Sequence, residues 1–309
     1  MKLSPRFTLL VYVLAVGWAS PLFRLANAPP LLAGGARIAI ATLLLAPFSM
    51  GALRPAFADR RLLGKVLFAG LLLAAHFALW IPALSLTSIA ASTVLVSMQP
   101  LFSAVLERLA FGARVAPRVA LGAGAALAGT GVIAAGDLGQ GDWLSSRALL
   151  GDLLSLAGAA TAAAYFVLGR GARKQMPIGG YLLLVNATAA AALLAASAVR
   201  GEPWFAAGPG PAPDGWQGID GSAFCWFLLL AVVPQLLGHG MANLTVRHYP
   251  VVVVNVAGLA EPILSSALVW WIFGDSVPAS VWMGAPLVLA GMAAALTAPQ
   301  PAGDAAGAE

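Results

Sequence analysis

Residues 99–112 read QPLFSAVLERLAFG, and residues 261–274 read EPILSSALVWWIFG. When the chain is aligned with itself at an offset of 162 residues, the matches extend beyond these two segments. The aligned pairs are Pro100 and Pro262, Ser103 and Ser265, Gly112 and Gly274, Gly122 and Gly284, Leu127 and Leu289, and Gly129 and Gly291. The chain therefore contains an internal repeat, which is clearest in the C-terminal part of each copy.

The composition around this repeat is strongly apolar. Of 309 residues, 60% are hydrophobic and only 9% are charged, with a mean hydropathy of +0.88. An average soluble protein carries about a quarter of its residues as Asp, Glu, Lys and Arg. So little charge cannot cover a soluble globule of this length, which excludes a soluble enzyme and indicates a membrane protein.

The apolar runs divide the chain into segments that are long enough to cross a bilayer as helices. We expect an all-α membrane protein with ten transmembrane helices. They are expected near Phe7–Phe23, Leu31–Met50, Val66–Leu84, Ser88–Leu106, Pro117–Ala135, Ala148–Leu168, Pro177–Val199, Ser222–Thr245, Val251–Phe273 and Ser280–Ala298.

Ten spans and one duplication give five helices to each copy. Because five is odd, the second copy must enter the membrane in the opposite orientation, which makes the copies inverted repeats. We assign residues 1–136 and 148–298 to the two five-helix repeats, and residues 299–309 to a disordered cytoplasmic tail. Such halves form a site between them that opens to either side by rocking, so this architecture favours a transporter.

Positive charge sets the orientation. With the N-terminus inside, the cytoplasmic segments carry 13 of the 17 Lys and Arg residues: Lys2, Arg6, Arg54, Arg60, Arg61, Lys65, Arg108, Arg114, Arg118, Arg170, Arg173, Lys174 and Arg247. The positive-inside rule therefore places both termini in the cytoplasm. A competing interpretation takes Lys2, Arg6 and the run up to Ala28 as a cleavable secretory signal. Cleavage would leave nine spans, whereas the repeat requires ten.

Several functions are excluded by what the sequence lacks. Cys225 is the only cysteine, and with three histidines it gives no zinc-site spacing, so we expect no metal and no cofactor. The chain has no phosphate-binding G-x-x-x-x-G-K-[ST], no H-E-x-x-H and no G-x-S-x-G motif. Its positive charges follow membrane topology, so no nucleic-acid partner is expected. We therefore predict neither an enzyme nor an ATP-driven pump.

The chain resembles the EamA family of the drug/metabolite transporter superfamily. The resemblance is carried by Ala83-Leu84 through Thr87-Ser88, Pro100-Leu101-Phe102, Gly112, Leu259-Ala260-Glu261-Pro262, Gly274-Asp275, and Arg37 shortly after Pro29-Pro30. It covers nearly the whole chain and implies a basket-like ten-helix bundle that exports amino acids or other small metabolites. Two pairs depart from the family pattern of Gly-Glu after the fourth and ninth spans: they are Gly112-Ala113 and Gly274-Asp275.

Polar side chains at membrane depth are costly unless they face a wet cavity or a partner, so each one is a candidate for function. Gln99 and Glu261 are repeat equivalents, and each precedes a proline and lies four residues before a serine. Pro100 and Pro262 free a backbone carbonyl and kink their helices where the halves meet. The alternative is a packing kink, with Gln99 and Glu261 bonded to neighbouring helices.

Two further helices carry polar stripes. Gln235, His239 and Asn243 recur at intervals of four in the eighth span, and His76 and Trp80 do so in the third. Such stripes face either a cavity or hydrogen-bonding neighbours. We expect a substrate cavity among spans three, four, eight and nine, with contributions from one and six. The substrate-binding candidates are His76, Trp80, Gln99, Gln235, His239, Glu261, Trp18 and Tyr165.

Arg37 and Glu261 have two alternative roles. As an ion pair they are structural, or a gate that breaks during rocking, and this interpretation is preferred because Arg37 has no other obvious partner. If Glu261 instead faces the cavity near His76 or His239, it takes up a proton in an antiport cycle.

The sequence thus predicts a multi-pass secondary transporter of the cell inner membrane that exports small metabolites, amino acids first, by alternating access. Its expected partners are a small-molecule substrate, membrane lipids and, in an antiport cycle, protons, and it is expected to be a monomer or a weak homodimer. The alternatives are an exporter of drugs or other metabolites, and a membrane scaffold or lipid-handling protein that transports nothing.

Overall fold

The structure is a computed structural model, and it describes residues 4–83, 86–87, 89–135, 146–204, 221–274 and 276–298. All regular structure in these residues is helical. The expected tail 299–309 and Asp275 lie outside the described residues.

The helices are α1 Pro5–Val16, α2 Ala19–Ala26, α3 Pro30–Ser49, the 3₁₀ turn η1 Met50–Leu53, α4 Arg54–Ala58, α5 Arg60–Ala83, α6 Ile89–Val96, α7 Gln99–Phe111, α8 Pro117–Ala135, α9 Ser146–Arg173, α10 Ile178–Val199, α11 Gly221–Leu230, the π-helix η2 Ala231–His239, α12 Gly240–Thr245, α13 Val251–Gly258, α14 Glu261–Phe273 and α15 Ala279–Leu296.

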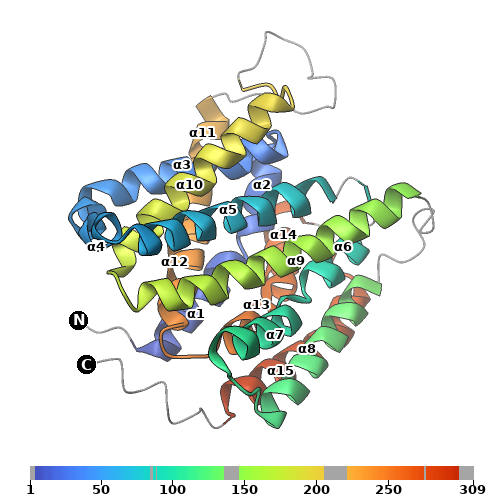
Figure 1. The fold of residues 1–309 in the computed structure, drawn as a ribbon. Helices are drawn as coiled ribbons and strands as arrows, with labels where there is room; N and C mark the ends of the chain where they lie inside the picture. Colours follow the sequence, from blue (N-terminus) through green and yellow to red (C-terminus); the bar gives the residue numbers. More distant parts are fainter. Residues whose placement is uncertain are drawn as a thin grey trace.

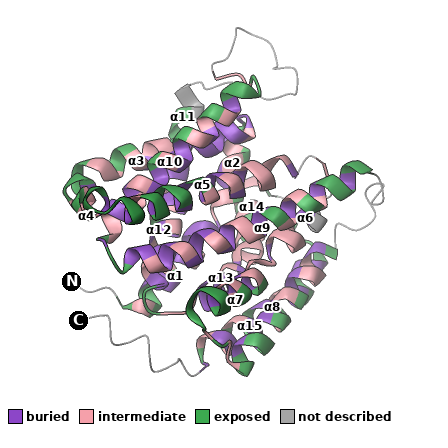
Figure 2. Ribbon diagram, viewed as in Figure 1, coloured by how far each residue is buried: buried purple, intermediate pink, exposed green. Residues whose placement is uncertain are grey.

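Within the described residues, ten helical segments are long and apolar enough to cross a membrane. Three of them are each built from two helices: α1 with α2, α6 with α7, and α13 with α14. Two more join three elements each: α3 continues through η1 into α4, and α11 continues through η2 into α12. Large apolar side chains cover the outside of the bundle, as a lipid environment requires, and Figure 2 shows exposed residues alternating with buried ones along α7 and α8.

The helices pack mainly as pairs. The closest partners are α8 with α15, α5 with α9, and α3 with α10, while α1 packs on η2. Figure 1 shows α8 and α15 side by side at the lower right of the bundle. The main core lies between α1, α3, α5, α9, α10 and α13, and a second core joins α8, α13 and α15.

Small residues allow α8 and α15 to approach closely. A Cβ atom on Gly122 would lie 2.5 Å from the carbonyl oxygen of Gly291, and one on Gly129 would lie 2.7 Å from that of Gly284. The contacts are reciprocal, because Cβ atoms on Gly284 and Gly291 would meet the carbonyls of Gly129 and Gly122. The fifth and tenth spans therefore contact each other through glycines that are equivalent in the repeat.

Glycine also ends the two segments with which the sequence comparison began. Both α7 and α14 stop at a residue in the left-handed conformation, Gly112 with φ of 66° and Gly274 with φ of 73°. This conformation closes a helix C-terminus without strain only where the residue has no Cβ. The repeat register derived from sequence therefore corresponds to a shared local structure.

Two helices that begin after a proline are capped by carboxylates from distant parts of the chain. Glu202, which follows α10, accepts hydrogen bonds from the N–H groups of Leu31 and Leu32 at the start of α3. Glu107 of α7 accepts them from Val251 and Val252 at the start of α13. Neither helix has a capping side chain of its own, so the distant carboxylates satisfy the free N–H groups and match the helix dipole.

Candidate functional site

The helices line a partly open cavity of about 310 Å³. Side chains from both halves of the chain line it, from Tyr12 of α1 to Ser266 of α14. The helices that contribute are α1, α2, α3, α5, α6, α7, α8, α9, η2, α13 and α14. The six spans expected from sequence are all represented, together with the second span through Arg37 and the fifth through Ile133 and Ala134.

The helix breaks beside this cavity coincide with the predicted kinks. α6 ends at Val96 and α7 begins at Gln99; α13 ends at Gly258 and α14 begins at Glu261. Pro100 and Pro262 occupy the first turn of the second helix in each span, where a missing N–H is tolerated. Gln99 and Glu261 thus stand at equivalent positions on the cavity wall.

The aromatic side of the cavity comes from α5 and its neighbours. The rings of His76 and Trp80 are stacked, with centroids 5.9 Å apart and planes within 8°. A hydrogen bond of 2.9 Å joins His76 Nδ1 to the carbonyl oxygen of Gly158 in α9 and fixes the ring. Phe77 contacts the ring of His239 edge to face at 6.0 Å. His76, Trp80 and His239, all candidates from sequence, therefore meet at one wall.

Arg37 does not form the expected ion pair. Its guanidinium lies against the rings of Phe23 and Phe77, at 5.0 and 4.5 Å from their centroids. Among the described residues none forms an ion pair with Arg37, and its buried Nε has no hydrogen-bond partner. Glu261 lines the same cavity and interacts with Arg37 electrostatically across it. The preferred ion-pair interpretation is therefore wrong for this conformation, because aromatic rings rather than a carboxylate hold the cation.

The polar stripe of the eighth span is divided instead of sharing one face. Gln235 donates to Asn186 Oδ1 at 3.1 Å, His239 lines the cavity, and Asn243 donates to the Tyr165 hydroxyl at 2.7 Å. The cause is the π-helix η2, because its wider turn rotates side chains that an α-helix would align at intervals of four. Gln235 therefore binds a neighbouring helix and does not line the cavity.

Of the two remaining aromatic candidates, one lines the cavity. Tyr165 does so and is held by Asn243. Trp18 does not: it packs edge to face on Trp271 with centroids 6.4 Å apart, outside the lining. Trp18 lies at the break between α1 and α2, directly after Gly17.

Four polar atoms on the cavity lining are buried and lack a partner in the structure. They are Arg37 Nε, Trp80 Nε1, His239 Nδ1 and Asn255 Oδ1. Buried polar groups in proteins are almost always hydrogen-bonded, and their clustering around a cavity is typical of a site that receives a polar ligand or water.

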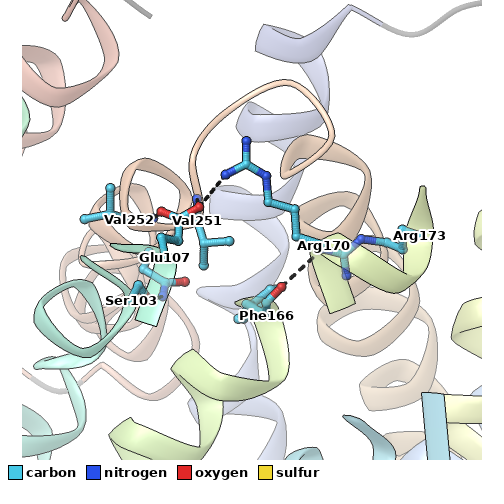
Figure 3. A network of polar contacts seen from close by, with 8 residues as sticks. Ser103, Glu107, Phe166, Arg170, Arg173, Val251 and Val252 are labelled. Carbon is cyan, nitrogen blue, oxygen red and sulfur yellow. Dashed lines mark hydrogen bonds and ion pairs between the residues drawn. The ribbon is translucent and has the colours of Figure 1, made fainter. Parts of the chain in front are cut away.

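A network that sequence reasoning missed lies beyond the cavity, where α7, α9 and α13 meet (Figure 3). Glu107 accepts a hydrogen bond of 2.5 Å from Arg170 and also binds the start of α13, while Ser103 accepts one from Asn255 at 2.6 Å. Nearby, Arg173 donates to Asn243 and to the carbonyl oxygen of Phe166. Arg170 lies close to the end of its span, so the sequence alone assigned it to a cytoplasmic segment, and Glu107, just after the fourth expected span, received no role. The sequence at the start of α13, Pro250-Val251, gives no indication that its N–H groups bind Glu107, 144 residues away.

Comparisons with known proteins agree with this architecture. The model of the EamA-like transporter family matches the chain twice, over residues 5–135 and 149–297. Among solved structures, 29 chains match. One crystal structure superposes with a TM-score of 0.74, covering 94% of this chain and 96% of that one. At 20% sequence identity, this likeness concerns the fold alone. No curated protein matches at a significant level.

Proposed function

The chain belongs to the EamA-like transporter family, within the drug/metabolite transporter superfamily, and from this premise we propose how it works. It is a secondary transporter of the cell inner membrane that exports small metabolites of the amino-acid class by alternating access. Its substrate occupies the central cavity, and its environment is the lipid bilayer.

The central cavity is the observation that carries this proposal. Its volume of about 310 Å³ suits a small solute, and its lining combines aromatic rings with one guanidinium, one carboxylate, two imidazoles and several hydroxyls. Its buried polar atoms without partners provide hydrogen bonds that only a bound solute or water completes.

Reciprocal packing supports the inverted repeat. The contact of Gly122 with Gly291 has its equivalent in that of Gly284 with Gly129, as a two-fold axis between α8 and α15 requires. The other pairs follow the same rule, since α5 packs on α9 while their repeat equivalents η2 and α1 pack on each other. The two halves, proposed as residues 1–136 and 148–298, therefore act as two bodies that rock around the shared cavity.

The broken spans supply the moving parts. α6 and α13 each end beside the cavity, and α7 and α14 begin there. A break between two short helices allows one of them to tilt without bending a continuous hydrogen-bond ladder. The network around Glu107 joins α7, α9 and α13, and in the proposed cycle it would close the cavity on its side. By the positive-inside rule this side, with both termini, is cytoplasmic.

The experiment is efflux of a radiolabelled panel of amino acids and other metabolites from proteoliposomes, with and without a pH gradient. The proposal is supported if wild-type flux is saturable and the folded His76→Ala variant abolishes it. If flux depends on the pH gradient in wild type but not in Glu261→Gln, transport is coupled to protons through Glu261. If folded wild-type protein moves no solute of a broad panel, the proposal fails and a scaffold or lipid-handling role replaces it.

A further inference from the structure

The guanidinium of Arg37 is an unusual feature of the cavity. The side chain is 2% exposed, and no hydrogen bond or ion pair within the described part of the chain engages it. Contacts with Phe23 and Phe77 stabilise the cation only in part. The face of an aromatic ring attracts a buried cation more weakly than a carboxylate would. A buried cation of this kind, on a cavity wall, is ready to receive an anionic group.

Glu261 presents the opposite charge to the same space. It is the first residue of α14, it lines the cavity, and no described residue forms an ion pair with it. Glu261 and Arg37 both line this cavity, although no ion pair joins them. The cavity therefore holds one positive and one negative group that are separated from each other and lack partners of their own.

A third wall is aromatic. The stacked rings of His76 and Trp80 stand with Phe77 on α5, and Trp80 Nε1 and His239 Nδ1 are free to bond to a solute. This wall fits an apolar or aromatic group that extends from a charged head. Together the three walls differentiate between the two ends of a small zwitterion.

We infer that the cavity recognises free α-amino acids as zwitterions: Arg37 binds the carboxylate, Glu261 binds the ammonium group, and the wall of His76 and Trp80 receives the side chain. This inference rests on the proposed transport function and deepens it by assigning both ends of the substrate. An amine without a carboxylate leaves Arg37 unpaired, and an acid without an amine leaves Glu261 unpaired. Each mismatch costs binding because a buried charge loses its partner.

The test measures binding and flux separately. Equilibrium binding of radiolabelled phenylalanine to detergent-purified protein is competed with phenylalanine, phenylalaninamide and 3-phenylpropionate, with the corresponding leucine and threonine sets in parallel. The amide lacks the carboxylate, and the propionate lacks the ammonium group. For wild type, each analogue is expected to compete about tenfold more weakly than the amino acid, or worse still.

Two variants are each expected to lose one of the two preferences, for the carboxylate or for the ammonium group. In Arg37→Gln the amino acid is expected to lose its advantage over the amide and to keep its advantage over the propionate. In Glu261→Gln the reverse is expected. Arg37→Lys retains the charge and restores part of the preference. Arg118→Gln removes one exposed positive charge that does not belong to the lining and serves as the matched control. All variants are compared only if they elute as monodisperse protein.

The outcomes separate the inference from the proposed function. If folded Arg37→Gln still prefers the amino acid over its amide as wild type does, or if wild type binds none of the amino acids, the inference is wrong. If wild type binds amino acids with the expected selectivity but proteoliposomes show no flux, the binding site stands and the transport function fails. If flux is found for solutes that are not zwitterions, transport stands and the inference fails.

Discussion

Glu107 of α7 and Arg170 of α9 form a buried ion pair of 2.5 Å, and the same carboxylate accepts hydrogen bonds from Val251 and Val252. One side chain therefore joins two helices and caps the start of a third. The carboxylate and guanidinium compensate each other's loss of hydration, whereas either one alone would be an uncompensated buried charge.

Glu107→Gln is therefore expected to destabilise the protein by about 3 kcal/mol, because Arg170 then loses its counter-charge and α13 loses an anionic cap. Thermal unfolding in detergent, followed by tryptophan fluorescence, measures the effect as a lower midpoint. Arg108→Gln is the control, since the neighbouring side chain is exposed. Equal midpoints for the two variants would show that the buried pair does not stabilise the fold.

The contact between α8 and α15 gives a prediction with a control on the same helix. Gly122→Ala places a methyl group 2.5 Å from the carbonyl oxygen of Gly291, so the helices must separate. A Cβ on Gly124 meets nothing within 4 Å, and alanine is favoured over glycine in a helix by about 1 kcal/mol. We expect Gly122→Ala to lower the unfolding midpoint and Gly124→Ala to leave it unchanged or raise it. The opposite order would contradict the packing.

Substitutions of a tryptophan that lines the cavity and of one outside it are expected to affect the KM of transport differently. Trp80 lines the cavity and stacks on His76, whereas Trp282 is 71% exposed on the outside of the bundle. Trp80→Ala is expected to raise KM about tenfold, because a substrate loses an aromatic contact worth about 1 kcal/mol together with the order of the His76 ring. Trp282→Ala keeps the wild-type KM. Concentration series of flux in proteoliposomes decide the point, and equal KM values would remove Trp80 from the site.

Gln235 and His239 are polar residues of the same span with different expected roles: Gln235 bonds to a neighbouring helix, and His239 lines the cavity. Gln235→Leu breaks the bond to Asn186 and is expected to cost about 1 kcal/mol of stability while KM stays at the wild-type value. His239 lines the cavity, so His239→Ala is expected to change KM. Both variants are compared by unfolding midpoint and by flux. A raised KM in folded Gln235→Leu would place that amide in the site after all.

Much of the fold follows from sequence because the controlling features are periodic or repeated. Apolar length locates the spans, and the duplicated Gln-Pro and Glu-Pro steps locate the two helix breaks that border the cavity. His76 and Trp80 are candidates because they form a stripe on the third span, whereas no sequence pattern singles out Tyr165; all three line the cavity.

The errors have local causes. The stripe of Gln235, His239 and Asn243 assumes an α-helical turn, and a π-helix around Pro234 changes which side chains share a face. The pair of Arg37 with Glu261 was inferred from charge alone, whereas Phe23 and Phe77 are held against the guanidinium by tertiary packing. Glu107 was missed because partners 63 and 144 residues away give no local pattern.

The central claim is that the cavity opens in turn to each side of the membrane and holds the substrate. Ser266 lines it, and Cys225, the single cysteine, is exposed outside it. In a Cys225→Ser background, Ser266→Cys in oriented proteoliposomes is treated with a membrane-impermeant thiol reagent from either side, with and without substrate. We predict labelling from both sides and protection by a transported amino acid. A cysteine that reacts from only one side, or that substrate does not protect, would contradict the account.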